Sequence, residues 1–176
     1  YTYLDDAERG CGFMITLRPA HVADVEAITE LWNYYIRETA VTFNSIEKTA
    51  ETVREAILEC RKDKRAFLIA ENRGRLVGFC TYFQFRGGIG YEKTMEHTIL
   101  AQPDVQGRGI GRGLMQRLFD HAQAEGVKSL WAGVSGDNPG GVAFHESIGF
   151  SNIARLPQVG HKFDRWIDLI LLQKVL

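Results

Sequence analysis

The chain has 176 residues, of which 45% are hydrophobic and 24% charged, and its formal net charge is -1 at pH 7. This length suits one domain with a single substantial core, and the composition is that of an ordinary soluble globular protein. The near-zero charge gives no reason to expect a nucleic acid or an acidic membrane as partner. No apolar run approaches the length of a membrane span.

The three cysteines, Cys11, Cys60 and Cys80, show no C-x-x-C spacing. Their odd number and their spacing indicate neither a disulfide framework nor a zinc site, so no metal is expected. A reducing cytoplasm is the simpler setting for such a chain.

The first residues are acidic rather than basic ahead of a short apolar patch, unlike a signal peptide. Met14 directly precedes the first regular strand pattern. We therefore expect residues 1–14 to be an extension outside the fold and residues 15–176 to form a single domain.

Along the chain the hydrophobic pattern alternates between the two-residue period of strands and the 3.6-residue period of helices. It predicts, in order, a strand (15–18), two helices (22–35 and 49–62), three strands (66–71, 76–85 and 94–101), a helix (109–125), a strand (127–134), a short helix (140–147) and two last strands (150–156 and 166–172). No internal repeat or linker divides the chain. This order predicts a mixed α/β sheet with helices on both faces.

Four glycines occupy every second position of the stretch 105–114, namely Gly107, Gly109, Gly111 and Gly113. They free the backbone from side-chain crowding, so that consecutive N–H groups can point into one concavity. Apolar residues at helical spacing follow directly, which places the positive N-terminal end of a helix at the same point. Arg108 and Arg112 add positive charge there. We predict a site for a pyrophosphate, with a flexible glycine-rich turn as the alternative.

The glycine spacing fits neither the loop of the P-loop nucleotidases nor the Rossmann fingerprint. It resembles the Q-x-x-G-x-G/A signature of the GNAT family of N-acetyltransferases, at Gln106, Gly109 and Gly111. The resemblance covers about residues 15–172 and implies a mixed, mostly antiparallel central sheet with helices on both faces. It also implies acetyl-CoA as cosubstrate, with its pyrophosphate held by Gln106, Gly107, Arg108, Gly109, Ile110, Gly111 and Arg112.

Two further elements of this family's cofactor site have counterparts here. The backbone of the strand before the glycine loop, at Ile99, Leu100 and Ala101, would pair with the pantetheine arm as with an extra strand. Asn138 matches the asparagine of the family pattern N-x-x-[SA]-x-x-L-[YH]-E, although Gly141 replaces the usual small residue. A turn residue before proline is an equally good interpretation of Asn138.

The candidate base is Glu96, a carboxylate inside a predicted strand shortly before the glycine loop. Burial without a role is costly for such a group, and partial burial would raise its pKa towards the working pH. A solvent-facing residue of an edge strand is the alternative. His97 points to the opposite face of the strand, so we interpret it as structural or as a helper.

The candidate acid is His145, which stands where many GNAT enzymes carry tyrosine. It would protonate the departing thiolate as an imidazolium or orient the sulfur. A histidine on the helix surface without a catalytic duty is the open alternative.

Three separated segments, 33–43, 94–98 and 156–168, resemble the phosphinothricin and methionine sulfoximine or sulfone N-acetyltransferases. These enzymes acetylate the α-amine of small amino acids, and the resemblance implies a homodimer.

Arg86 matches an arginine that this subfamily places near the substrate carboxylate, and a surface salt bridge is the alternative. Phe85 and Tyr91 are candidate walls for the substrate side chain. For Tyr35 and Phe43, which could serve as such walls too, the hydrophobic core is the favoured interpretation.

The leading hypothesis is therefore direct acetyl transfer in a ternary complex, because no cysteine lies in a motif suited to a covalent intermediate. One alternative is an acetyltransferase that acts on proteins or peptides. The other is a CoA-binding sensor without catalytic activity.

Overall fold

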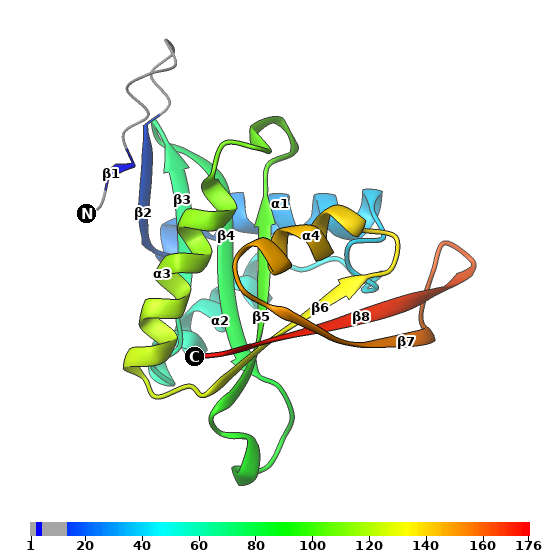
Figure 1. Cartoon of the computed structure of the whole chain (residues 1–176). Helices are drawn as coiled ribbons and strands as arrows, with labels where there is room; N and C mark the ends of the chain where they lie inside the picture. Colours follow the sequence, from blue (N-terminus) through cyan, green and yellow to red (C-terminus); the bar gives the residue numbers. More distant parts are fainter. Residues whose placement is uncertain (1–2, 5–13) are drawn as a thin grey trace.

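The computed structural model describes residues 3–4 and 14–176 (Figure 1). Its strands are β1 (Tyr3–Leu4), β2 (Ile15–Pro19), β3 (Phe67–Asn72), β4 (Arg75–Gln84), β5 (Thr94–Ala101), β6 (Ser129–Ser135), β7 (Ser151–Lys162) and β8 (Arg165–Val175). Its α-helices are α1 (Val25–Glu38), α2 (Ala50–Lys62), α3 (Ile110–Ala124) and α4 (Pro139–Ser147), and 3-10 turns occupy Val22–Asp24, Ile89–Tyr91 and Pro103–Val105. Every helix and strand that the pattern predicts is present.

The eight described strands form one sheet in the order β1-β2-β3-β4-β5-β6-β8-β7. All neighbours in this sheet are antiparallel except β5 and β6, which are parallel and joined by the crossover through α3. That pair is short, since its register begins at Thr94 opposite Ser129 and ends at Glu96 opposite Trp131. The predicted mixed, mostly antiparallel sheet is confirmed.

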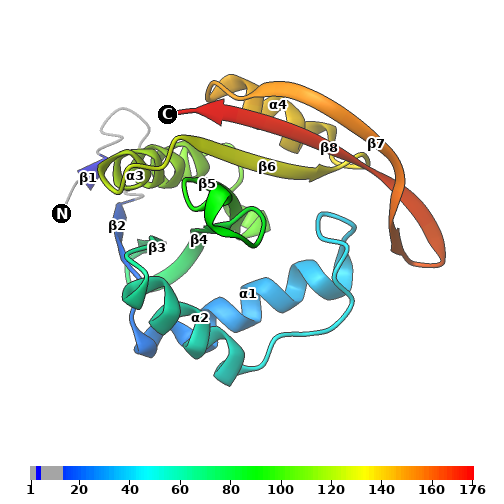
Figure 2. The ribbon, with the colours of Figure 1, turned by 90° about the horizontal axis from the view of Figure 1, so that it is seen from below.

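Helices cover both faces of the sheet, as predicted, with α1 and α2 on one side and α3 and α4 on the other (Figure 2). Helix α1 buries an apolar stripe at the spacing seen in the sequence, including Val25, Ile28 and Leu31. Helix α3 does the same on the opposite face with Leu114 and Leu118. Each face therefore has its own apolar cluster, and the sheet separates the two.

The predicted ends of the last two strands are wrong. Strands β7 and β8 extend beyond 150–156 and 166–172, and they pair as far as Lys162 opposite Arg165. The turn between them consists of Phe163 and Asp164 at positive φ, 52° and 56°. Phe163 is an unusual residue at such φ values, although Asp164 is a common turn residue, so the sequence carries only a weak signal for this turn.

Two residues of the segment expected to lie outside the fold are part of the sheet. Tyr3–Leu4 form β1, which pairs antiparallel with Thr16 and Ile15 of β2. The remaining residues of that segment, apart from Met14, lie outside the described part of the chain, as does Cys11.

Candidate active site

A cavity of about 970 Å³ lies where β5 and β6 stop pairing. Its lining comes from β5, β6, the glycine loop, the first turns of α3 and α4, and the segment 41–44 between α1 and α2. This volume is at the upper end of the range for small-molecule sites in proteins.

The glycine loop forms one end of this cavity. Gly107 and Gly109 have φ values of 78° and 77°, a backbone conformation that residues with a Cβ rarely adopt. Gly109 is the N-cap of α3 and provides no side-chain cap, so the first N–H groups of the helix keep no side-chain partner there. The end of α3 is thus suited to an anion.

The predicted pyrophosphate residues lie together in the structure. Those that line the cavity are Gln106, Gly107, Gly109, Ile110, Gly111 and Arg112, whereas Arg108 is not among the lining residues. A Cβ at Gly111 would lie 3.1 Å from the ring of Phe144, so this glycine allows α3 to approach α4 closely. Arg112 donates to Ser147 and joins the same two helices.

The strand edges beside this end of the cavity are open. Beyond Glu96, β5 pairs with β4 alone, and Ile99, Leu100 and Ala101 line the cavity along the edge that faces β6. The Tyr35 hydroxyl donates to the Ala101 carbonyl at 2.7 Å and holds the end of the strand. An extended ligand with amide groups could pair with this edge as a further strand does.

Asn138 is both a helix cap and a residue of the cavity wall. It is the N-cap of α4, since its Oδ1 accepts from the Gly141 N–H at 2.9 Å, and it also lines the cavity. A Cβ at Gly141 would lie 2.5 Å from Asn138 Nδ2. A side chain at this position would therefore require the Asn138 amide to move.

Glu96 lies on the cavity wall at the last β5–β6 pair, opposite Phe83 of β4 and Trp131 of β6. Its side chain is half-buried, and burial raises the pKa of its carboxyl group. A Cβ at Gly133 would lie 3.1 Å from Glu96 Oε1, so the absence of a side chain at Gly133 makes room for the carboxylate. A half-buried carboxylate that faces an open cavity suits proton removal from a bound ligand.

His145 is buried, with 6% of its surface exposed, so the interpretation as a helix-surface residue is wrong. Its Nδ1 lies 2.6 Å from the Gly141 carbonyl oxygen and its Nε2 lies 3.2 Å from Nε2 of His97. Burial lowers the pKa of His145, and burial together with the neighbouring His145 lowers the pKa of His97 well below its ordinary value. Both rings are therefore neutral at pH 7.

The predicted substrate residues Arg86, Phe85 and Tyr91 do not line the cavity. Phe85 stacks on Trp131 with ring centroids 5.2 Å apart, and the Arg86 guanidinium lies 5.7 Å from the centre of the Phe85 ring. Because Trp131 is the register partner of Glu96, this stack borders Glu96 on the side away from the glycine loop.

The segment between α1 and α2 contributes more to the cavity than the sequence indicated. Tyr35 of α1 is buried in the core, as favoured, and also lines the cavity, whereas Phe43 is only partly buried and lines the cavity together with Val41 and Thr42. Lys162, on β7, is buried and donates to the Thr42 carbonyl at 2.8 Å, which fixes this segment on the β7–β8 hairpin. The signal in the sequence is the placement of Tyr35 and Phe43 within the first resembling segment, 33–43.

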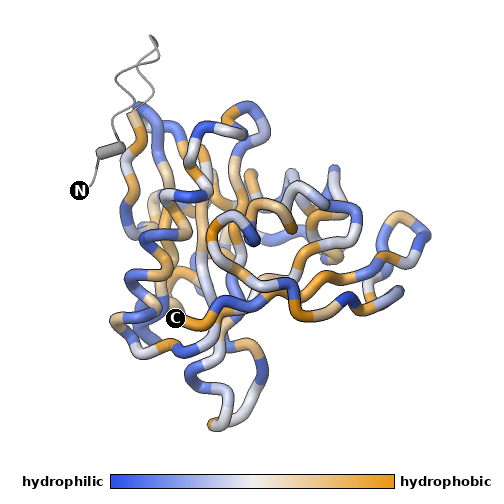
Figure 3. The backbone as a smooth tube through the Cα atoms, in the orientation of Figure 1, coloured by the Kyte–Doolittle hydropathy of each residue, from blue (hydrophilic) through white to orange (hydrophobic). Residues whose placement is uncertain are grey.

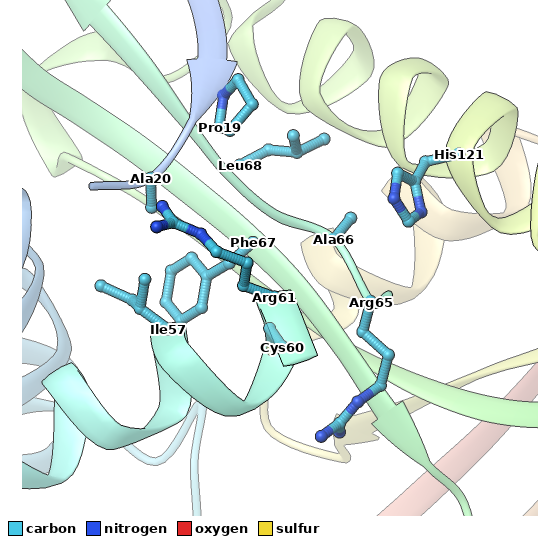
Figure 4. A pocket seen from close by; sticks show the side chains of 10 residues that line it. All are labelled: Pro19, Ala20, Ile57, Cys60, Arg61, Arg65, Ala66, Phe67, Leu68 and His121. Carbon is cyan, nitrogen blue, oxygen red and sulfur yellow. The ribbon is translucent and has the colours of Figure 1, made fainter. Parts of the chain in front are cut away.

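A second cavity, of about 120 Å³, lies between α2, β3 and α3 (Figure 4). Three of its polar side chains have protein partners. Cys60 Sγ is 3.4 Å from Thr81 Oγ1, Arg65 pairs with Asp63, and the ring of His121 meets the hydroxyl of Tyr82. Burial raises the pKa of the Cys60 thiol. We assign no chemistry to this cavity.

The described residues hold no group of three or more histidine, cysteine, aspartate or glutamate side chains that could bind a metal ion. No helix in residues 14–176 is long and apolar enough to cross a membrane.

Comparisons with known proteins agree with this geometry. The model of the acetyltransferase (GNAT) family matches residues 28–150. An L-methionine sulfoximine/L-methionine sulfone acetyltransferase of Salmonella typhimurium is 37% identical over 161 residues, which cover 90% of this chain and 93% of that protein. A phosphinothricin N-acetyltransferase of Streptomyces coelicolor is 31% identical over 166 residues, which cover 92% and 96%.

A solved structure is also similar to this chain. A GNAT superfamily phosphinothricin acetyltransferase from Sinorhizobium meliloti, in complex with acetyl-CoA, superposes with a TM-score of 0.88 at 26% identity. The match covers 92% of this chain and 88% of that one. The chain therefore belongs to the acetyltransferase (GNAT) family.

Proposed function

We propose that this acetyltransferase transfers the acetyl group of acetyl-CoA to the α-amine of a small amino-acid-like substrate. The substrate class is that of phosphinothricin, methionine sulfoximine and methionine sulfone, which the names of the relatives give for those proteins. The observation that carries the proposal is the half-buried Glu96 carboxylate on the wall of the same cavity as the glycine loop. The domain that carries this activity spans residues 15–176.

The cofactor site that we propose has two parts: the glycine loop with the start of α3, and the open edge of β5. The N-terminal end of α3 and the glycine loop hold the pyrophosphate through backbone N–H groups. The open edge of β5 at Ile99, Leu100 and Ala101 pairs with the pantetheine amides, and Asn138 borders the same channel. These contacts place the thioester between the open edges of β5 and β6, on the side where Glu96 lies.

Glu96 acts as the general base in this proposal. An amino acid enters with an ammonium group, which cannot attack a carbonyl until it loses a proton. Glu96 accepts that proton, directly or through water, and the free amine attacks the thioester carbonyl. The carbon–sulfur bond then breaks, so that the amide forms, and the departing thiolate takes up the proton that the attacking nitrogen loses. The transfer is direct in this proposal, since the two cysteines of the described residues, Cys60 and Cys80, are buried and neither lines this cavity.

His145 orients the reacting sulfur in this proposal. A neutral ring whose Nδ1–H is held by the Gly141 carbonyl presents a fixed polar wall, whereas an imidazolium would be a buried charge without a counterion. Of the two roles that the sequence left open for His145, the geometry therefore favours orientation of the sulfur.

In this proposal Arg86 binds the substrate carboxylate, and Phe85 and Tyr91 lie beside the substrate side chain. The support is the subfamily resemblance together with the Phe85–Trp131 stack, which borders Glu96. A guanidinium can bind a carboxylate through two parallel hydrogen bonds and so fix the α-carbon.

We also propose a homodimer in the cytoplasm. The β7–β8 hairpin exposes apolar side chains, Ile153, Val159, Phe163 and Trp166, each with at least half of its surface exposed. In Figure 3 hydrophobic residues recur along this hairpin. Exposed apolar residues that gather on one element are typical of a contact surface.

The free thiols of Cys60 and Cys80 suit a reducing compartment, which supports the proposed cytoplasmic location.

The test is release of CoA thiol from acetyl-CoA with methionine sulfoximine, methionine sulfone, phosphinothricin and a peptide amine. We expect turnover of the small amino acids and a fall in kcat of about 100-fold or more for Glu96→Gln, the range of general base catalysis. Arg86→Ala should chiefly raise KM for the amine. Turnover of the peptide alone would overturn the substrate class. Binding of CoA without any turnover would favour a sensor.

A further inference from the structure

His145 and His97 form a buried pair whose hydrogen positions follow from their partners. The Gly141 carbonyl only accepts hydrogen bonds, so His145 Nδ1, 2.6 Å away, carries a proton. In a neutral ring His145 Nε2 then carries a lone pair. His97 Nε2, 3.2 Å from it, must therefore be the donor. Chemistry fixes one tautomer for each ring.

Among the described residues, His97 has no second hydrogen-bond partner. With its proton on Nε2, its Nδ1 carries a lone pair, and this atom is buried without a hydrogen-bond partner among the described residues. His97 is 7% exposed and packs against the ring of Phe150, 5.5 Å away. An additional proton on either ring would leave a buried N–H group without an acceptor, in addition to the buried charge.

The surroundings of the pair are apolar. His145 also packs on Phe144 of its own helix, and Phe150 contacts Phe119 of α3. Lys174 of β8 lies behind these rings, where it covers Phe119 and donates to the Ile148 carbonyl. Glu96 points to the other face of β5, as alternation along a strand requires. In the described part of the chain neither histidine has an ion-pair partner.

We propose that His97 is a positioning residue for acetyl transfer: its Nε2–H holds His145 in a single neutral tautomer and ring orientation at the wall of the active-site cavity. The inference rests on the proposed function for the statement that His145 meets the reacting sulfur. His97 and Glu96 are neighbours on β5 that face opposite sides. One strand therefore carries the base on one face and the support of the sulfur-orienting ring on the other.

Two substitutions separate positioning from packing. His97→Gln places an amide N–H near the position of Nε2 and keeps the donor, whereas His97→Phe keeps the ring volume and removes the donor. Positioning predicts that His97→Phe lowers kcat about tenfold, the lower bound for loss of a supporting hydrogen bond to a functional histidine, with KM for acetyl-CoA nearly unchanged. His97→Gln should retain most of kcat. A packing role predicts the reverse order, because phenylalanine suits an apolar site better than glutamine.

The pH dependence gives a readout that packing would not change. In the wild-type chain the His97 Nε2–H points at His145 Nε2. It disfavours protonation of that nitrogen and so lowers the pKa of His145. In His97→Phe this effect is lost, so the pKa of His145 rises, and the part of the acidic limb of kcat that protonation of His145 sets moves to higher pH, whereas the part that protonation of Glu96 sets stays in place. Unchanged kcat and an unchanged acidic limb in His97→Phe would overturn the proposal.

A structural measurement is independent of turnover. Two-bond proton–nitrogen NMR correlations distinguish the two neutral tautomers of each histidine. We expect His145 protonated on Nδ1 and His97 on Nε2 at pH 7.5, with His121→Gln as control because His121 pairs with Tyr82 instead. A proton on Nε2 of His145 would refute the positioning role. If these tautomers are found but no amine is acetylated, the proposed function fails and the assignment of the pair stands.

Discussion

At the scale of single residues, burial of Glu96 lowers the stability of the folded chain when the carboxyl group is ionised, and the same burial suits this group to proton removal. The unfolded chain protonates this side chain with an ordinary carboxyl pKa, whereas burial raises the pKa in the folded state. Between the two values the folded state binds more protons, so the free energy of unfolding falls as the pH rises through this window. The loss is fully present only above the folded-state pKa.

Glu96→Gln should therefore be more stable than the wild type at neutral pH, by roughly a few tenths of a kcal/mol for a partly exposed group. At a pH below the ordinary carboxyl value the difference should vanish. Urea unfolding at the two pH values measures it, and the exposed Glu92→Gln serves as control. A less stable Glu96→Gln at neutral pH would mean that the carboxylate makes a favourable contact in the folded state.

At the scale of elements, the glycine loop and the first turn of α3 form one functional unit. Gly109 needs φ 77° at the N-cap, and Gly74 needs φ 83° in the β3–β4 turn, with open space at both Cβ positions. Alanine at either position should cost about 1 kcal/mol or more in stability because of the left-handed backbone.

The two variants should differ in function. Gly109→Ala should raise KM for acetyl-CoA several-fold, because it shifts the N–H groups at the start of α3, whereas Gly74→Ala should leave KM unchanged. Steady-state kinetics together with thermal unfolding of both variants tests this. Equal KM values would place the cofactor contacts elsewhere than on this loop.

Some of these elements follow from local sequence patterns and others depend on tertiary packing. Local patterns predicted the strands, the helices and the glycine loop, because periodicity and backbone freedom are properties of neighbouring residues. They did not predict that Phe163 and Asp164 make the β7–β8 turn, since a phenylalanine at positive φ is unusual and Asp164 alone is a weak turn signal. They also missed the contact between His97 and His145, which depends on the packing of α4 against β5.

At the scale of the whole molecule, two segments far apart in the chain close the cavity together. Phe43, between α1 and α2, lines the cavity, and its ring lies directly where a Cβ on Gly160 of β7 would stand. Lys162 fixes the same two segments through the Thr42 carbonyl. The wall therefore depends on a contact between the N-terminal and C-terminal parts of the chain.

Gly160→Ala should displace the Phe43 ring and raise KM for the amine, with a loss of stability of about 1–3 kcal/mol from overpacking. Phe43→Ala removes the obstacle, so the double variant should be more stable than the two single losses added together predict. A double-mutant cycle by urea unfolding, with KM for the amine and for acetyl-CoA measured in each variant, tests the coupling. Additive losses would show that Phe43 and Gly160 act independently and that the wall does not join the two segments. A negligible stability loss in Gly160→Ala with KM for the amine still raised would instead mean that Phe43 moves freely against the hairpin, and that its position, rather than the rigidity of the wall, sets the space for the substrate.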